Sequence, residues 1–266
     1  MSKFIQNIHS PKDLKKLSYS QLDVLCEEIR DTLVETVSKC GGHLASNLGA
    51  VELTVALHRV LDAPKDKIVW DVGHQSYVHK ILTGRLSELS TLRQKDGLCG
   101  FCSPLESEYD TSFTGHASAS LSTALGMVEA RNFTNENYEV AAVIGDGSFA
   151  GGLSMEAINN IGNLKSKMLI VLNDNEMSIS KNVGAFSTYL AKARTNPKYT
   201  ALKQKTIDAV HRMPEGDGVY KVLKNVKTQL KKMLAPNILF EQLGVTYLGP
   251  VDGHNIKDIE ELLKKI

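Results

Sequence analysis

The stretch that most constrains the fold runs over residues 140–180. Short apolar runs rich in β-branched residues lie at 140–144 and 168–172. Both are too short for buried helices, so we expect two buried parallel strands. Between them, apolar residues recur at helical spacing, at Leu153, Ala157, Ile158 and Ile161. A strand–helix–strand unit makes a right-handed crossover, so both strands end at one edge of the sheet, where open α/β proteins bind ligands.

Polar residues follow both predicted strands. The first strand ends in the motif GDG at 145–147, and the second ends in NDN at 173–175. Glycines let the backbone approach a ligand closely, and the amides after the turn open a helix, which favours an anion. An aspartate beside a phosphate requires a cation between them, and carboxylate, amide and phosphate oxygens are ligands that Mg²⁺ prefers. The pattern predicts a diphosphate bridged to Asp146 and Asn175 by a metal ion.

Two other interpretations fit the first motif. Gly145-x-Gly147-x-x-Ala150 also matches a dinucleotide-binding fingerprint, in which Asp174 would hold a ribose. Glycine amides bind the pyrophosphate of such sites without a metal, so an aspartate between the glycines is awkward there. A structural turn with an acidic residue at a helix start is the third interpretation. The asparagine-rich loop after the second strand favours the metal–diphosphate site over both.

Further histidines follow glycines elsewhere in the chain. His43 lies in GGHLAS, between a helix that Gly41 and Gly42 end and a second helix over 51–61. His74 follows a predicted strand over 68–72, which sets it at the same ligand edge as Asp146. A lone histidine in a loop beside a helix is more often a surface or capping residue. The residue pattern alone therefore does not assign a function to His43 or His74.

The chain resembles a known family. GDG followed by Asn175 resembles the thiamine diphosphate motif of the transketolase superfamily. The segments VLNDNEMSIS, WDVGHQSYVHKILTGR, GGHLASNLGAVELTVALH and PVDGH are similar to the 1-deoxy-D-xylulose-5-phosphate synthase family. The resemblance runs along the whole chain and covers about the first half of that family's usual length.

The resemblance implies a fold and a set of metal and phosphate ligands. It implies a parallel α/β sheet with helices on both faces, the thiamine diphosphate-binding fold of the transketolase N-terminal type. We expect at least five strand ends at the ligand edge, near Asp71, Thr114, Gly145, Asn173 and Leu248. Asp146 and Asn175, with the carbonyl of Met177, would hold Mg²⁺, and the amides of Gly147 and Ser148 would bind the diphosphate.

The resemblance also implies residues around the cofactor. His74, Gly115, His116 and Ala117 would line it, with Ala117 in place of a serine that is common in the family. His43 and His74 are the candidates for proton transfer, because imidazole titrates near neutral pH.

The activity implied is condensation of pyruvate with glyceraldehyde 3-phosphate to 1-deoxy-D-xylulose 5-phosphate and CO₂, by a cytoplasmic homodimer. A pyrimidine-binding domain with an activating glutamate, a C-terminal domain and the last strand of the present domain are not recognised within 266 residues. We therefore expect a fragment of such a synthase, or one subunit of a split enzyme, inactive alone. A NAD-dependent dehydrogenase and a non-catalytic binding module are the other classes left open.

Composition agrees with an ordinary globular protein. Hydrophobic residues make up 42% and charged residues 23%, which is ordinary globular usage, and 266 residues suffice for one large domain or two small ones. The net charge of +1 argues against a nucleic-acid partner, and neither a signal peptide nor a transmembrane run is recognised, so no membrane partner is expected. Four cysteines imply no disulfide framework, and we interpret the Cys99–Cys102 motif as incidental.

The remaining segments are expected to be structural. We expect one domain over 1–266 with a mobile, lysine-rich insert at about 187–235, a strand within 240–248 and a closing helix over 256–266. Ser18 and Gln21 form a capping box before a first long helix. His79 is as readily structural as functional, and His254 could approach the site or cap the last helix.

Overall fold

The computed structural model describes residues 4–174 and 240–265. The insert expected at about 187–235 lies outside these residues. In chain order the elements are η1 (Phe4–Asn7), α1 (Pro11–Leu14), α2 (Tyr19–Cys40), α3 (Leu44–Leu48), α4 (Val51–Val60), β1 (Lys67–Trp70), α5 (Tyr77–Lys80), η2 (Ile81–Arg85), η3 (Leu86–Thr91), α6 (Ser120–Thr134), β2 (Val140–Gly145), α7 (Asp146–Phe149), α8 (Gly152–Leu164), β3 (Leu169–Asn173) and α13 (Ile256–Leu263).

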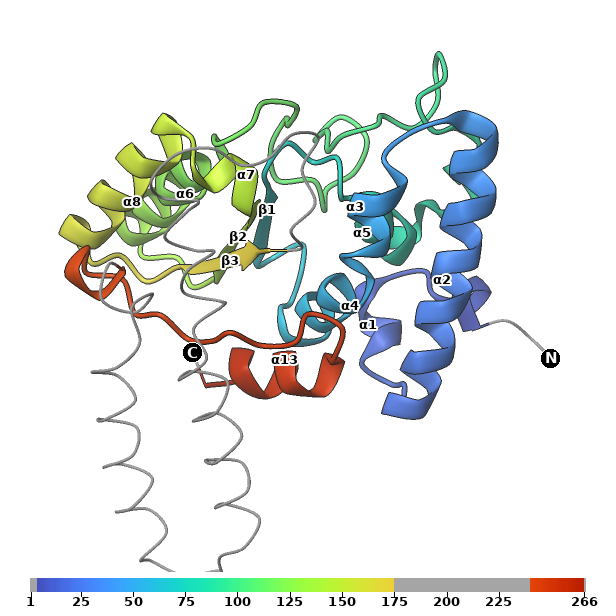
Figure 1. The fold of residues 1–266 in the computed structure, drawn as a ribbon, viewed down its shortest axis with the longest axis horizontal. Helices are drawn as coiled ribbons and strands as arrows, with labels where there is room; N and C mark the ends of the chain where they lie inside the picture. The colour runs from blue at the N-terminus through green and yellow to red at the C-terminus, as the bar shows by residue number, and fades with distance from the viewer. Residues whose placement is uncertain (1–3, 175–239, 266) are drawn as a thin grey trace, which may run out of the picture.

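Three parallel strands form the described sheet, in the order β1-β2-β3 (Figure 1). The register pairs Trp70 of β1 with Val143 of the central strand, and Gly145 with Asn173 of β3. All three strands therefore end at the same edge. The parallel α/β fold expected from the sequence is confirmed.

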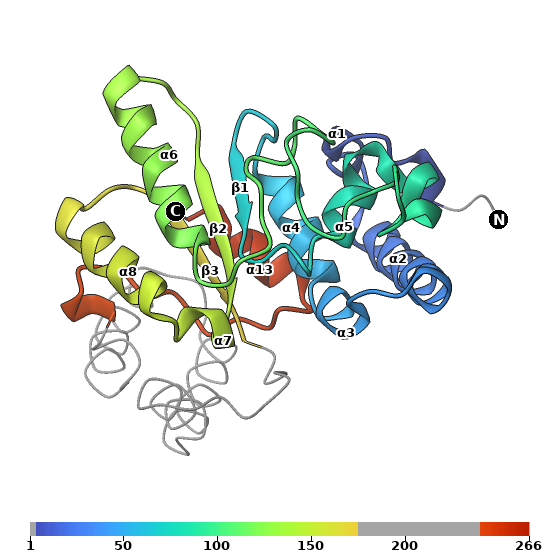
Figure 2. The ribbon, with the colours of Figure 1, turned by 90° about the horizontal axis from the view of Figure 1, so that it is seen from above.

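Helices cover both faces of this sheet. Successive side chains of a strand point to opposite faces, and β2 divides accordingly: Ala141 and Val143 enter one hydrophobic cluster, and Val140, Ala142 and Ile144 enter the other. Helices α2, α4 and α13 contribute to the first cluster and α6 and α8 to the second, on the other side of the strands (Figure 2). The central strand is thus buried on both faces, which explains its continuous apolar sequence.

Helix α2 follows the sequence signals closely. The Gln21 amide donates to Ser18 Oγ over 3.4 Å, and the Ser18 amide donates to Gln21 Oε1 over 2.8 Å, which completes the predicted capping box. The helix stops at Gly41, whose φ of 71° is left-handed backbone that favours glycine. Its buried side chains lie on one face and enter the first cluster: Leu22, Leu25, Cys26, Ile29, Leu33 and Val37.

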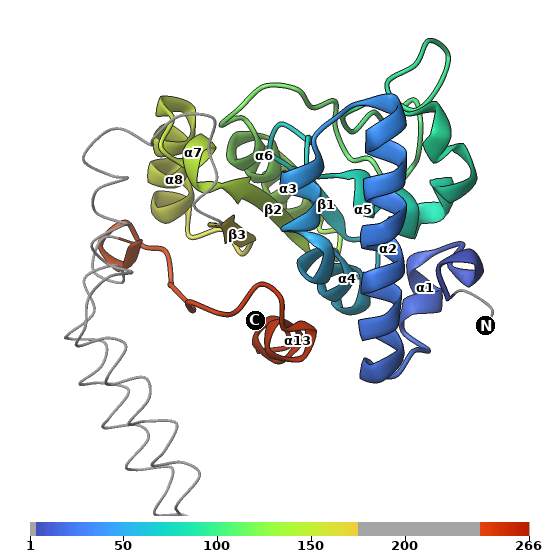
Figure 3. The same cartoon turned by 45° about the vertical axis from the view of Figure 1, so that its right-hand side comes forward.

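Helix α13 lies beside α4 and below the sheet (Figure 3). Ile256 and Ile259 enter the first hydrophobic cluster, and Glu260 is buried in an ion pair with Arg59 of α4. The Asn255 side chain caps the helix by accepting from the Asp258 amide over 3.1 Å. The closing helix is therefore where the sequence predicted it, although it ends at Leu263.

Two expected strands are absent from the described residues. Residues 112–114 form a loop, and the Thr111 hydroxyl donates to the Ile68 carbonyl of β1 over 3.0 Å, a group that a neighbouring strand would otherwise use. Residues 243–250 carry no strand, and the Val245 amide turns back to the Phe240 carbonyl over 2.8 Å. The expectation of five strand ends was wrong for this part of the chain, which has three. No helix in it combines the length and apolar character needed to cross a bilayer.

Candidate active site

The turns after β1 and β2 lie at the same carboxyl edge of the sheet, because the two strands are parallel neighbours. Gly145 pairs directly with Asn173 at the ends of the two neighbouring strands. Asp146 opens α7 and is only 8% exposed, and His74 follows the turn that ends β1. The structure thus brings Asp146 and His74 to the edge where the sequence predicts a ligand.

The Asp146 turn is anchored by the packing of Phe149 in the hydrophobic core. Phe149 of α7 is buried, and its ring lies 5.8 Å from that of Phe240. Gly147 is exposed and Ser148 half-buried. The other two expected metal ligands, Asn175 and Met177, lie outside the described residues.

Asp71 connects this turn to the start of α6. Its carboxylate accepts from the amides of Ser118 (3.0 Å) and Ser120 (3.1 Å). The Ser118 hydroxyl donates to the Ser148 carbonyl over 2.7 Å, and a Cβ added to Gly151 would lie 2.1 Å from the same hydroxyl oxygen. One buried carboxylate therefore fixes two loops of the edge, a role that the sequence analysis missed although an aspartate directly after a strand was visible.

His43 and His74 form a pair above β1. Their rings meet edge to face, with centroids 5.5 Å apart and an interplanar angle of 76°. The fully buried Asn47 side chain donates to the carbonyls of both His43 (2.6 Å) and His74 (2.8 Å) and accepts from the Tyr77 amide over 2.8 Å. Asn47 therefore holds the two histidine loops together. The sequence signal was an asparagine within an apolar helical segment, and we did not identify it from the sequence.

Both imidazoles are neutral near pH 7. Burial lowers the pKa of His43, and the positive charge of Arg93 lowers it further. Burial also lowers the pKa of His74, and His43 adds to that shift. Nδ1 of His74 is buried and has no hydrogen-bond partner within residues 4–174 and 240–265. A buried ring nitrogen without a partner is a position where a ligand can supply one.

The predicted GHA motif lies on the exposed loop that leads to α6. Gly115, His116 and Ala117 are all exposed. Gly115 has φ of 141° and open space where a Cβ would lie, so its backbone conformation and not its surroundings favours glycine. A Cβ added to Gly73 would lie 2.2 Å from Thr114 Oγ1. The GHA loop therefore begins beside the turn that carries His74.

His79 belongs to a separate buried network. Its Nε2 lies 3.0 Å from Asp110 Oδ1, and its Nδ1 lies 2.8 Å from His58 Nε2. Arg85 donates to both oxygens of Asp110, at 3.0 and 2.8 Å. His79 is thus a structural residue that joins α4, α5 and the loop before α6.

The same network contains a geometric candidate for a metal site. Ligand atoms of His79, Cys102 and Asp110 lie within 4.8 Å of one another. However, Arg85 already binds the carboxylate, and Lys80 lies 3.8 Å from it. Burial raises the pKa of the Cys102 thiol to about 12, so it stays protonated. These charges disfavour a cation, and the network is structural.

His254 contacts α4 and not the histidine pair. Its Nδ1 lies 3.1 Å from Glu52 Oε2, and Glu52 also accepts from Arg30 Nη2 over 2.5 Å. Asn255, not His254, caps α13. Of the two roles left open for His254, the described structure supports neither.

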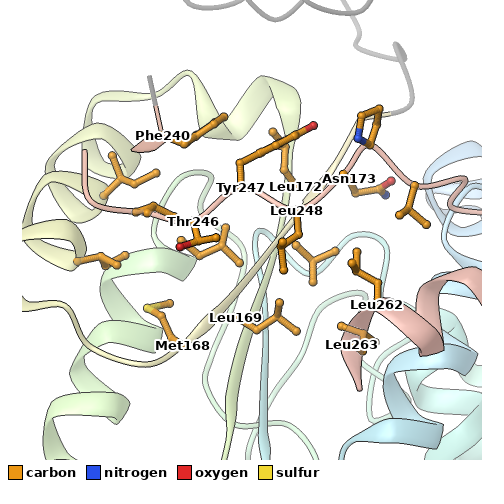
Figure 4. Close-up of a pocket in the computed structure, with 18 of the residues that line it drawn as sticks. Met168, Leu169, Leu172, Asn173, Phe240, Thr246, Tyr247, Leu248, Leu262 and Leu263 are labelled. Carbon is orange, nitrogen blue, oxygen red and sulfur yellow. The ribbon is translucent and has the colours of Figure 1, made fainter. Parts of the chain in front are cut away.

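An apolar pocket of about 820 Å³ runs along β3 (Figure 4). Asn173 and Asp174 are among the residues that line it, whereas His43 and His74 do not line it. The pocket is therefore distinct from the histidine pair. Its apolar lining includes Leu169, Leu172, Tyr247, Leu248, Leu262 and Leu263, which belong to β3, the 243–251 segment and α13.

Known structures share this fold. Transketolase from Campylobacter jejuni matches with a TM-score of 0.64 and 18% identity, over 94% of this chain and 36% of that one. A transketolase from Pichia stipitis matches with a TM-score of 0.62 and 16% identity, over 90% of this chain and 33% of that one. At these identities the likeness shows a transketolase-like fold.

Sequence relatives identify the family. The sequence model of the 1-deoxy-D-xylulose-5-phosphate synthase family matches residues 5–266. Enzymes of that name from Pelotomaculum thermopropionicum and Lachnoclostridium phytofermentans are 51% and 53% identical, each over 99% of this chain. The chain spans 41% and 42% of the length of these two relatives. With a match of this length, the chain belongs to the 1-deoxy-D-xylulose-5-phosphate synthase family.

Proposed function

We propose that residues 1–266 form the diphosphate-binding domain of a thiamine diphosphate-dependent synthase. This enzyme condenses pyruvate with glyceraldehyde 3-phosphate to 1-deoxy-D-xylulose 5-phosphate and CO₂. The observation that carries the proposal is the position of Asp146 and His74 at the same carboxyl edge of a parallel sheet, in a chain of this family. Open α/β sheets bind ligands at that edge.

The residues at the edge fit the cofactor. Asp146 offers a hard carboxylate oxygen for Mg²⁺, with Asn175 and Met177 as the further ligands that we assign to it. Nδ1 of His74 is buried and has no hydrogen-bond partner among the described residues, so it can form a hydrogen bond with the cofactor. The remaining contacts that we assign are the amides of Gly147 and Ser148 to the diphosphate, and the lining residues Gly115, His116 and Ala117.

His43 and His74 are the proton-transfer groups in this proposal. When bound, the cofactor supplies the electron sink that decarboxylation and carbon–carbon bond formation require. The protein positions the reactants and moves protons. Burial lowers the pKa of each histidine, so near pH 7 each is a neutral imidazole with one N–H hydrogen-bond donor and one nitrogen that can accept a proton.

The complete reaction requires more protein than this chain. We assign the aminopyrimidine half of the cofactor to a second domain or subunit that carries a glutamate. Loss of one positioned acid or base costs about 10²–10⁴-fold in rate, so we expect the chain alone to turn over at least that much more slowly than a complete relative. We further propose that the complete enzyme is a cytoplasmic homodimer, which gel filtration and cell fractionation can test.

Cofactor binding is the first test. We expect thiamine diphosphate with Mg²⁺ to raise the melting temperature of the chain, and NAD to leave it unchanged. Asp146→Asn should weaken the calorimetric affinity for thiamine diphosphate in the presence of Mg²⁺. Asp258→Asn, on the exposed face of α13, is the matched control. Stabilisation by NAD alone would favour a dehydrogenase, and an unchanged affinity of Asp146→Asn would refute the metal assignment.

A further inference from the structure

The Tyr77 hydroxyl lies directly against His43. Tyr77 begins α5 and is fully buried, and Asn47 fixes its backbone by accepting from the Tyr77 amide over 2.8 Å. The hydroxyl oxygen lies 3.4 Å from the His43 backbone nitrogen and 3.3 Å from His43 Nδ1. One phenol oxygen therefore contacts two nitrogens of the same residue.

Counting hydrogens assigns the direction of both contacts. A backbone N–H can only donate, so the Tyr77 oxygen accepts from the His43 amide. The single hydroxyl hydrogen then requires an acceptor. Within residues 4–174 and 240–265, His43 Nδ1 is the acceptor in hydrogen-bond reach. Nδ1 must then be unprotonated, and a neutral His43 carries its hydrogen on Nε2.

The opposite tautomer fits the contacts poorly. With its hydrogen on Nδ1, His43 would direct two donors at the Tyr77 oxygen and leave the buried hydroxyl hydrogen without an acceptor among the described residues. An unmade hydrogen bond of a buried group costs more than a made one contributes. Gly42 maintains the contact: its φ is 138°, and a Cβ at that position would lie 2.8 Å from the Tyr77 oxygen.

We propose that Tyr77 is a positioning residue that holds His43 in the Nε2–H tautomer. His43 then presents Nε2–H as a hydrogen-bond donor, and cannot serve as a base at that atom. The tautomer is a property of this chain alone, whereas its use in the reaction rests on the proposed function. Nε2 of His43 has no hydrogen-bond partner among the described residues, and the centroids of the His43 and His74 rings lie 5.5 Å apart.

Nitrogen NMR of the chain, labelled with ¹⁵N-histidine, tests the tautomer directly. Protonated and unprotonated ring nitrogens have well-separated chemical shifts, and the spectrum of His43→Gln assigns the His43 signals. At a pH well above the His43 pKa, we expect an unprotonated Nδ1 and a protonated Nε2. A protonated Nδ1 in the unmodified chain overturns the proposal without any need for a variant at Tyr77.

Tyr77→Phe removes the hydroxyl and keeps the ring. We expect the ratio of the two tautomers to fall by about 2- to 10-fold, which corresponds to the loss of one neutral hydrogen bond. Tyr138→Phe is the matched control, because the Tyr138 hydroxyl donates to the Met127 carbonyl over 3.0 Å, a contact that does not involve His43. Unchanged His43 shifts in folded Tyr77→Phe would overturn the proposal.

Cofactor binding separates this proposal from the proposed function. Calorimetry with thiamine diphosphate and Mg²⁺ on the same samples tests the function and does not involve the tautomer. The Nε2–H tautomer in a chain that binds no cofactor would reject the function alone. A bound cofactor with His43 protonated on Nδ1 would reject the role of Tyr77 alone.

Discussion

Asp110→Asn measures how strongly the buried polar network stabilises the fold. The Asp110 side chain is fully enclosed and accepts hydrogen bonds from His79, from both terminal nitrogens of Arg85 and from the Ser103 amide. Asparagine keeps the shape but replaces one acceptor oxygen with a donor. It also removes one of the two carboxylates beside Arg85 and Lys80, so Glu106 alone remains to balance two buried positive charges.

The expected loss is large for one isosteric change. Removing one partner of a buried ion pair costs about 3–5 kcal/mol, and we expect the free energy of unfolding to fall by that amount at pH 7. Urea unfolding followed by circular dichroism measures it. Asp23→Asn, an exposed change on α2, should alter stability by less than about 0.5 kcal/mol. A loss below about 1 kcal/mol in Asp110→Asn would refute the reasoning.

The pH dependence provides a second check. Burial by itself would raise the pKa of Asp110, but hydrogen bonds from His79 and Arg85 outweigh it and hold the pKa well below its usual range. A carboxylate with a depressed folded-state pKa stabilises the fold above its unfolded pKa, about 3.9, and loses that contribution as pH falls toward the folded value. The difference between the two proteins should therefore shrink below about pH 4. A difference that stays constant down to low pH would contradict the assignment.

Three further predictions follow from particular contacts. Ser18→Ala removes the α2 cap and should cost about 1 kcal/mol in urea unfolding; no loss would mean that water replaces the cap. Gly42→Ala places a Cβ against the Tyr77 hydroxyl at a residue with left-handed φ, and it should lower the free energy of unfolding by about 1–3 kcal/mol. Gly126→Ala lies in open space within α6 and should raise that free energy by about 0.5–1 kcal/mol. If the two substitutions changed stability equally, the contact between Gly42 and Tyr77 would be contradicted. Burial lowers the pKa of His58 well below its usual value, so the unfolded state binds more protons, and stability should decline as pH falls below about 6.5; a denaturation midpoint that is constant between pH 7 and pH 5 would count against it.

The sheet strands were predictable because their sequences meet one requirement. A strand buried on both faces must be apolar at every position, and 140–144 meets this requirement within one residue of the observed β2. The strand predicted over 168–172 likewise lies within one residue of β3. The start of α2 was predictable from its cap. These signals are local, so no knowledge of the partner segment was needed.

The two strands that were wrongly expected show the limit of local signals. Residues 112–114 and 240–248 resemble strand ends, but a strand exists only where a second segment completes its ladder. The Thr111 hydroxyl instead takes the Ile68 carbonyl, and the Val245 amide pairs with Phe240. Neither hydrogen bond could be inferred from the sequence, because each depends on how the later segment lies in space relative to its partner.

The buried polar residues of the candidate site were not predicted from the sequence, for one physical reason. Asn47 and Asp71 each bind backbone groups of a loop that is distant in the sequence. Every residue has a backbone carbonyl and nearly every residue a backbone amide, so the amino-acid pattern does not indicate which loop a buried side chain will bind. The loops at a ligand-binding edge cannot be fixed by strand-to-strand hydrogen bonds, because the ligand needs that space. Buried side chains that bind the loop backbone fix them instead. Substituting such a side chain lowers stability because its backbone partners would remain buried and unpaired. The rigidity of the histidine pair and of the Asp146 turn therefore depends on residues that need not touch a ligand.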